Sequence, residues 1–283
     1  MRVLITGAGS QLTAPLTATF ERTGHEVTAL SHADLDIRDL AAVGAAVSAG
    51  PGYGAVVNLA AANSVDGCEQ DPVSAYEGNT LGPMVLARTA RDAGAQFVTF
   101  SSDFVHGGLA QPPEYLDETT EAVPVNVYGH SKLLGERAVD AIGAHAYVLR
   151  TSWVVGERFL DGVRSSIEAG KVGLPEGGHA CPAVAADLCE VVRILLEGDA
   201  APGLYNVVNP PRTDRPALLE AIVSELGGDP SIVTVGPDTR PAPRPAYSPL
   251  GVSKLASLGI EMPPWREALH RFVAGEPSPL AAI

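Results

Sequence analysis

A tyrosine and a lysine four positions apart, Tyr128 and Lys132, are the pair in this chain best suited to proton transfer. Side chains with this spacing lie on one face of a helix. An ammonium group beside a phenol stabilises the phenolate and lowers the tyrosine pKa towards neutrality. Such a tyrosine can exchange a proton with a carbonyl or alcohol oxygen. The alternative is an exposed helix pair without a role, because the chain has seven tyrosines and chance matches are common.

Two serines follow an apolar run upstream of this pair. The residues Phe97–Phe100 predict a strand, and Ser101 and Ser102 stand at its end. In an open parallel sheet, the carboxyl ends of the strands line the ligand crevice. Either hydroxyl could therefore bond the reacting oxygen and orient it towards Tyr128. The alternative is that the serines only form the turn by which the chain leaves the sheet.

The first residues predict a phosphate-binding turn. The apolar run Val3–Ile5 leads directly into Gly7, and an amphipathic segment follows. This is how a strand feeds a helix over a bound dinucleotide, in a loop that usually carries three glycines. The places of the second and third glycine are taken here by Ser10 and Thr13, while Gly9 stands one place early.

These replacements predict a dinucleotide site that still binds, in a shifted pose or more weakly. Ser10 adds a hydroxymethyl group where phosphate should lie, although its hydroxyl could donate to that phosphate. The β-branched Thr13 should push the following helix outward, whereas Gly9 returns some freedom to the turn. A lost or repurposed site is the alternative.

The elements that must position these residues alternate regularly over the first 155 residues. Apolar runs predict strands at 3–5, 26–30, 55–59, 96–101 and 146–150. Helical patterns separate them at 15–23, 40–49, 75–93 (before Gly94 as a cap) and 131–142. Strands alternating with helices predict an α/β fold with a Rossmann-like, doubly wound parallel sheet.

The pattern loosens after about Val155, and further helices are predicted at 185–197, 216–226 and 264–273. We therefore expect a dinucleotide-binding domain over 1–155, to which 183–210 returns. The segments 156–182 and 211–283 are expected to form a smaller substrate-binding domain.

Composition excludes several classes of protein. The net charge of −14 repels nucleic-acid backbones, so DNA or RNA binding is not expected. Apolar runs are far shorter than the roughly 18 residues of a membrane span, and no signal peptide is evident. The three cysteines have no CxxC spacing, which argues against a zinc site or a disulfide framework. We expect a cytoplasmic globular protein.

Motifs along the whole chain carry a family resemblance. The chain resembles an extended short-chain dehydrogenase/reductase and, more narrowly, the dTDP-4-dehydrorhamnose reductase family. The segments that carry the resemblance are Leu35–Ile37, Asn58–Ala61, Val65–Asp66 with Glu69, Asn79–Pro83, Ser101–Val105, Asn126–Lys132 with Gly135–Glu136, Arg150–Val154, Ala185–Leu188, Arg244–Ser248 and Pro263–Leu269.

The resemblance implies a reductase that moves hydride from a nicotinamide to C4 of a nucleotide-linked 4-keto-6-deoxysugar. Tyr128 would then donate a proton to the nascent alkoxide, and Lys132 would lower its pKa and hold the nicotinamide ribose. Ser102, where the family usually has threonine, would bond the C4 oxygen. Trp153 falls where the family places an aromatic residue over the sugar.

The family pattern also assigns binding residues. For the cofactor these are Gly7, Ser10, Gln11, Leu12, Ser31, His32, Asp36, Ile37, Leu59, Ala60, Ala61, Asn79 and Lys132. For the substrate they are Val65, Asp103, Phe104, Trp153 and Arg244. Some members pair through the sheet domain, sometimes with an interfacial metal, so the resemblance leaves a homodimer open. No clustered acidic motif places a metal here.

Other positions depart from the family pattern. The second strand ends in Ser31 and His32, where an acidic residue often grips the ribose, so NADPH is favoured over NADH. Asp36 would lie near the adenine. Phe104 replaces a common tyrosine, and the segment 156–178 is shorter than usual. Arg244 is a candidate for contact with a substrate diphosphate, as are Arg240 and Lys254.

Two other functions remain open on the sequence. One is an enzyme of the same fold with non-redox chemistry, such as epimerisation or dehydration, in which Tyr128 serves another small molecule. The other is a non-catalytic regulatory subunit, which the altered glycine loop would favour.

Overall fold

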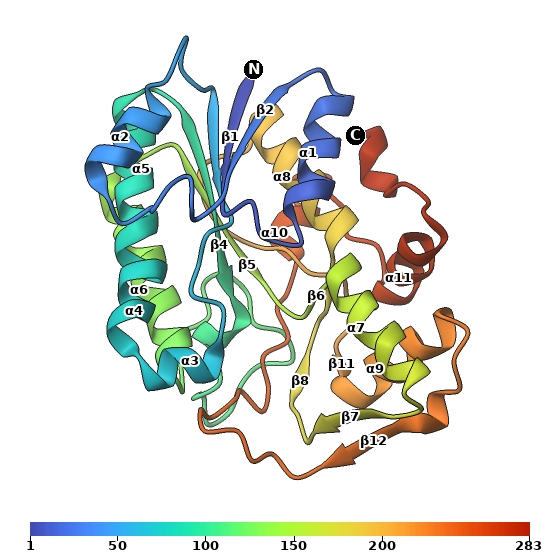
Figure 1. The fold of residues 1–283 in the computed structure, drawn as a ribbon. Helices are drawn as coiled ribbons and strands as arrows, with labels where there is room; N and C mark the ends of the chain where they lie inside the picture. Colours follow the sequence, from blue (N-terminus) through green and yellow to red (C-terminus); the bar gives the residue numbers. More distant parts are fainter.

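A six-stranded parallel sheet forms the centre of the larger lobe in this computed structural model, which describes residues 1–283 (Figure 1). The strand order is β2-β1-β3-β4-β5-β10. The bounds are β1 Arg2–Thr6, β2 Glu26–Leu30, β3 Ala55–Asn58, β4 Gln96–Ser102, β5 Ala146–Thr151 and β10 Gly203–Asn206. The direction of strand addition reverses between β1 and β3, where such sheets bind ligands. The predicted Rossmann-like fold class is confirmed.

Helices cover both faces of this sheet (Figure 1). One face carries α1 (Thr13–Arg22) and α8 (Ala185–Glu197), and the other carries α2 (Leu40–Val47), α5 (Gly82–Asp92) and α6 (Val127–Ile142). Alternate residues of a strand point to opposite faces. Val3 and Ile5 accordingly pack with α1 and α8, whereas Leu4 packs with α2 and α5.

The predicted helix over 75–93 is divided into parts. The short helices α3 (Val65–Gln70) and α4 (Pro72–Tyr76) come first, followed by a π-helical turn at Glu77–Leu81 and then α5. The turn packs closely against α6. This packing requires a glycine at position 135 of α6, because a side chain there would collide with the Asn79 carbonyl. The irregular turn therefore accommodates close contact between helices.

Helix α6 begins earlier than its strongest pattern, which starts at Ser131. Asn126 caps the helix by accepting a hydrogen bond from the Gly129 backbone amide at 2.7 Å. A side chain at Gly129 would meet the Phe104 carbonyl, so this end of the helix lies directly against the 3₁₀ turn Asp103–Val105. This contact brings Tyr128 beside the end of β4.

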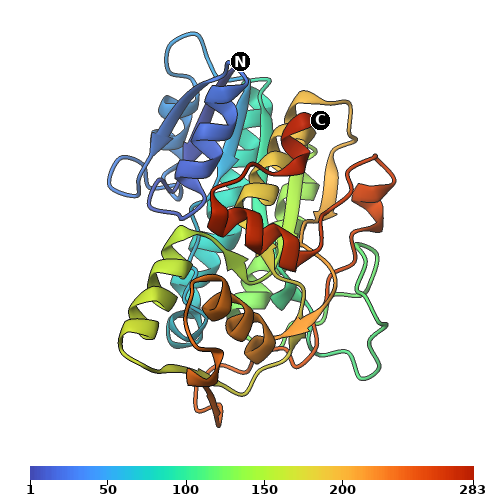
Figure 2. The same cartoon turned by 90° about the vertical axis from the view of Figure 1, so that its right-hand side faces the viewer.

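A smaller lobe lies below the sheet lobe in Figure 2. It contains α7 (Glu157–Glu168), α9 (Arg215–Glu225) and α11 (Trp265–Ala274), which share one apolar core. Pairs of short strands connect the segments of this lobe. These pairs are β6 (Val154–Val155) with β9 (Ala183–Val184), β7 (Val172–Pro175) with β12 (Val233–Gly236), and β8 (His179–Ala180) with β11 (Thr213–Asp214).

The two lobes interleave along the chain. Strand β10 and helix α8 join the sheet lobe, as does α10 (Ser253–Ala256), which packs on β10. Its core also takes Leu255, Ile260 and Leu280 from near the end of the chain. The domain bounds given above stay a prediction. No helix combines the length and apolar character that crossing a membrane requires.

Candidate active site

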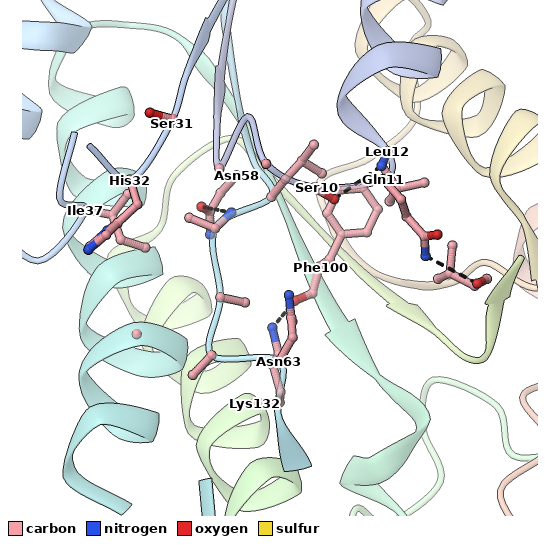
Figure 3. A pocket seen from close by; sticks show the side chains of 18 of the residues that line it. Ser10, Gln11, Leu12, Ser31, His32, Ile37, Asn58, Asn63, Phe100 and Lys132 are labelled. Atoms are coloured by element: carbon pink, nitrogen blue, oxygen red, sulfur yellow. Dashed lines mark hydrogen bonds between the residues drawn. The ribbon is translucent and has the colours of Figure 1, made fainter. Parts of the chain in front are cut away.

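A cavity of about 1250 Å³ runs along the carboxyl ends of the central strands. It brings together Tyr128 and most of the residues predicted to bind a cofactor. Those that line it are Gly7, Ser10, Gln11, Leu12, Ser31, His32, Asp36, Ile37, Leu59, Ala60, Ala61 and Lys132. Figure 3 shows His32 and Ile37 on one side of the cavity, the start of α1 on the other and Lys132 below.

Gly7 is the glycine that this loop cannot lose. Its φ is +78°, and a Cβ there would lie 2.4 Å from the backbone nitrogen of Ala60. The loops after β1 and β3 therefore touch at the point where the direction of strand addition reverses. Gly9 has neither constraint, because a Cβ there would meet open space.

Ser10 and Thr13 leave the cavity open. The Ser10 hydroxyl oxygen accepts a hydrogen bond from the Leu12 amide at 3.2 Å, so its proton is free for another acceptor. The Thr13 hydroxyl donates to the Gly7 carbonyl at 3.4 Å, and Thr13 does not line the cavity. Helix α1 starts at Thr13 and keeps its core contacts through Leu16.

Acidic residues gather at the end of the cavity near β2. The Ser31 hydroxyl donates to Asp34 at 2.6 Å, an acidic partner that the sequence analysis did not consider. Asp36 forms a two-pronged ion pair with Arg38, which also contacts Glu77 at 2.9 Å. His32 lines this end without a carboxylate partner.

Tyr128 and Lys132 lie at the opposite end. Lys132 donates to the Phe100 carbonyl at 3.1 Å (Figure 3), and its Nζ lies 5.8 Å from the centre of the Tyr128 ring. Burial lowers the pKa of Lys132 to about 8. Burial also raises the pKa of Tyr128 well above its usual range. The prediction that Lys132 brings this pKa towards neutrality is therefore wrong for this structure, because desolvation of the phenolate dominates.

The two serines have separate surroundings. Ser102 lies close enough to the Tyr128 phenol to offset part of the rise in the tyrosine pKa, while its hydroxyl donates to Asp103 at 3.1 Å. Ser101 instead donates to Glu136, which is held by a buried two-pronged ion pair with Arg150. Geometry therefore favours Ser102 as the partner of Tyr128, although only Ser101 lines the cavity.

The residues predicted to face the sugar lie beside the cavity and are held by protein contacts. Asp103 is 2% exposed and accepts a hydrogen bond from Ser248 at 2.6 Å, and burial raises its pKa to about 6. The Phe104 ring packs edge-on against Tyr128. Trp153 has a φ of +37°, a strained conformation of the kind that gathers at functional sites.

The remaining predicted residues do not line the cavity. Arg244 forms an ion pair with Asp66, and Arg240 forms one with Asp238. Lys254 donates to the Leu204 carbonyl and lies over the Tyr205 ring at the edge of the sheet.

Two further predicted residues also lie outside the cavity lining. Asn79 is buried and bonds the backbone of Ala62 on both its N–H and C=O sides, so it shapes the loop after β3. Val65 starts α3.

Arg38 lines the cavity and escaped the sequence analysis, as did two arginines of the smaller lobe. Arg158 and its neighbour Phe159, from α7, line the cavity near the glycine loop. Arg215, from α9, lies over the Trp153 ring with its Cζ 5.2 Å from the ring centre. Both come from the smaller lobe, where no local pattern marks a side chain that reaches across to the sheet.

Comparisons with known proteins agree with this arrangement. The family model of the RmlD substrate binding domain matches residues 1–276. A dTDP-4-dehydrorhamnose reductase of Streptomyces griseus is 37% identical over 283 residues, which cover 95% of this chain and 91% of that protein. One of Mycobacterium tuberculosis H37Rv is 35% identical over 285 residues, covering 96% and 92%.

A solved structure of the same kind of reductase is also similar to this chain. The crystal structure of the Bacillus anthracis dTDP-4-dehydrorhamnose reductase, in complex with NADP, matches with a TM-score of 0.88 at 27% identity. The match covers 97% of this chain and 99% of that one. With a family model spanning nearly its whole length and relatives above one-third identity, this chain belongs to the RmlD substrate-binding domain family.

Proposed function

We propose that this protein is an NADPH-dependent reductase of a nucleotide-linked 4-keto-6-deoxysugar. The observation that carries the proposal is the single cavity that joins the glycine loop to Tyr128 and Lys132. Its volume exceeds the roughly 300–1,000 Å³ of sites for drug-sized ligands, as a dinucleotide requires. The relatives named above are reductases of this substrate class, and the B. anthracis protein binds NADP.

The residues present fit a nicotinamide dinucleotide. Gly7 lets the loop approach closely, and Leu59–Ala61 form the facing wall. Gln11 and Leu12 stand at the N-terminus of α1, where a pyrophosphate is favoured. When bound, the reduced nicotinamide supplies the hydride.

Tyr128 is well prepared to donate a proton. Because burial raises its pKa, the phenol is protonated at neutral pH, which suits the reducing direction. The alkoxide formed at C4 takes this proton while the Ser102 hydroxyl bonds the same oxygen. The Lys132 ammonium then stabilises the phenolate that remains.

Titration of the purified protein with NADPH, followed by fluorescence, tests the cofactor assignment. Loss of NADPH absorbance on addition of a dTDP-4-keto-6-deoxysugar tests the reaction. We expect saturable micromolar binding and turnover. Failure to bind either nicotinamide at millimolar concentration would overturn the proposal and favour the regulatory or non-redox alternatives.

The variant Tyr128→Phe tests the proton donor. Turnover should fall by about 100-fold or more, the usual contribution of general acid catalysis, while NADPH binding stays intact. Tyr53→Phe is a matched control, because Tyr53 packs under Arg2 away from the cavity. A Tyr128→Phe protein with parental turnover would assign the proton to another group. A homodimer and a cytoplasmic location stay predictions.

A further inference from the structure

Arg158 connects the smaller lobe to the glycine loop. It stands in the first turn of α7, and its Nη2 donates a hydrogen bond to the Gly9 carbonyl of the sheet lobe. Arg158 and Gly9 both line the cavity. A second contact supports the same junction, since the side-chain amide of Gln11 donates to the Val154 carbonyl at 3.3 Å.

The charge of Arg158 is not neutralised by any carboxylate. Arg38, the other arginine that lines the cavity, is paired with Asp36 and Glu77. The neighbouring Glu157 is paired with Arg164, two turns along the same helix. Arg158 makes no ion pair, and only one of its five N–H donors has a hydrogen-bond acceptor.

Several backbone donors of the glycine loop are already occupied within the protein. The amides of Ala8, Ser10, Leu12 and Thr13 all bond acceptors within the protein. Between Gly7 and Ala14, the backbone amides of Gly7, Gly9, Gln11 and Ala14 have no acceptor. The Ser10 side chain thus occupies the Leu12 amide, a donor at the start of α1, where this fold binds a pyrophosphate.

We infer that Arg158 binds the pyrophosphate of the dinucleotide from the side of the smaller lobe, and so compensates for the missing glycines of the loop. This inference rests on the proposed function. A guanidinium presents a planar fork that matches phosphate oxygens, and the Gly9 contact holds it over the turn where they lie. Arg158 is thus a cofactor-binding residue that the smaller lobe supplies.

The experiment compares Arg158→Gln, Arg158→Lys and the control Arg164→Gln, which removes a charge from the exposed face of the same helix. The dissociation constant of NADPH is measured by fluorescence at two salt concentrations. Adenosine 2′-monophosphate, which lacks a pyrophosphate, is measured by competition with NADPH.

We expect Arg158→Gln to weaken NADPH about 10- to 100-fold, the effect of one charge-assisted hydrogen bond, and to reduce its salt dependence. Binding of adenosine 2′-monophosphate should not change. Arg158→Lys should recover part of the loss, because an ammonium keeps the charge but not the fork. Arg164→Gln should bind both ligands as the parent does.

Two results would overturn the inference alone. One is a parent protein that binds NADPH no better than Arg158→Gln. The other is a variant that loses NADPH and adenosine 2′-monophosphate equally, which would show general damage to the cavity. A parent protein that binds no NADPH overturns the proposed function as well, so the two failures are distinguishable.

Discussion

Burial shifts the pKa values of Tyr128 and Lys132, the proposed catalytic pair, in opposite directions. It raises the pKa of the Tyr128 phenol and lowers that of the Lys132 ammonium to about 8. Desolvation favours the neutral form of either group. The phenol therefore keeps its proton over the whole neutral range, and Lys132 is the member of the pair that titrates near physiological pH.

The pH profile of turnover should follow Lys132. At saturating substrates, we expect the rate to fall as the pH rises through about 8, because the ammonium that stabilises the phenolate is lost. In Lys132→Arg the rate should be lower but nearly independent of pH in this range, since a guanidinium stays charged. A fall at the same pH in both proteins would assign the titration to another group.

Glu136 lies one helical turn beyond Lys132 on α6. It forms an almost fully buried ion pair with Arg150 of β5. Glu136→Gln should lower the free energy of unfolding by about 3–5 kcal/mol, because Arg150 is left as an uncompensated buried charge. Urea unfolding measures this loss. Glu157→Gln, at an exposed ion pair, should cost about 1 kcal/mol or less. Equal losses in the two variants would contradict the assigned role of burial.

At the scale of elements, the turn between β1 and α1 offers a matched pair of glycines. Gly7→Ala should lower the free energy of unfolding by at least about 1–3 kcal/mol and impair NADPH binding, because the new Cβ meets Ala60 in a strained conformation. Gly9→Ala should change neither, since its Cβ enters open space. Thermal unfolding and NADPH titration check both. A tolerated Gly7→Ala would show that the loops can separate.

The sequence predicts five strands of the large sheet, where strand and helix patterns alternate, but not its edge strand β10. It does not predict the π-helical turn at Glu77–Leu81 or the two-residue strands of the smaller lobe, which depend on packing between distant segments. The early start of α6 could have been found, since asparagine at position 126 is a good helix cap.

The site residues likewise divide into those that local sequence predicts and those that depend on packing between distant segments. Gly7, which follows the end of β1, and Lys132, which lies on α6, are found from local motifs. The partner of Arg244 and the reach of Arg158 depend on how the lobes pack, which no local spacing encodes. The pKa of Tyr128 likewise depends on burial, which the lysine spacing alone does not indicate.

At the scale of the molecule, the segment 237–249 crosses from β12 to the foot of α3 (Figure 1). Asp66 of α3 pairs with Arg244 and also accepts from the Ala242 amide at 3.1 Å. Asn126 donates to the Pro243 carbonyl at 2.7 Å. This segment therefore ties the end of the smaller lobe to the start of α6.

Arg244→Ala should accelerate hydrogen exchange at amides 242–248 while lowering the free energy of unfolding by only about 1 kcal/mol. The partly exposed ion pair limits the global loss, whereas the local tie depends on it. Mass spectrometry of exchanged peptides measures the difference. Arg240→Ala is the control, because its partner Asp238 belongs to the same segment. Unchanged exchange in Arg244→Ala would mean that other contacts hold the segment.

The contacts around Asp103 and Trp153 have a kinetic consequence. Asp103 is hydrogen-bonded by Ser248 and the Trp153 ring is covered by Arg215, whereas the cavity beside Tyr128 is already open. The two reactants should therefore bind in a compulsory order. The dinucleotide binds first, and the sugar binds only after its own contacts replace those of Ser248 with Asp103 and of Arg215 with Trp153. Steady-state product inhibition would then show the oxidised dinucleotide competing with NADPH but not with the sugar.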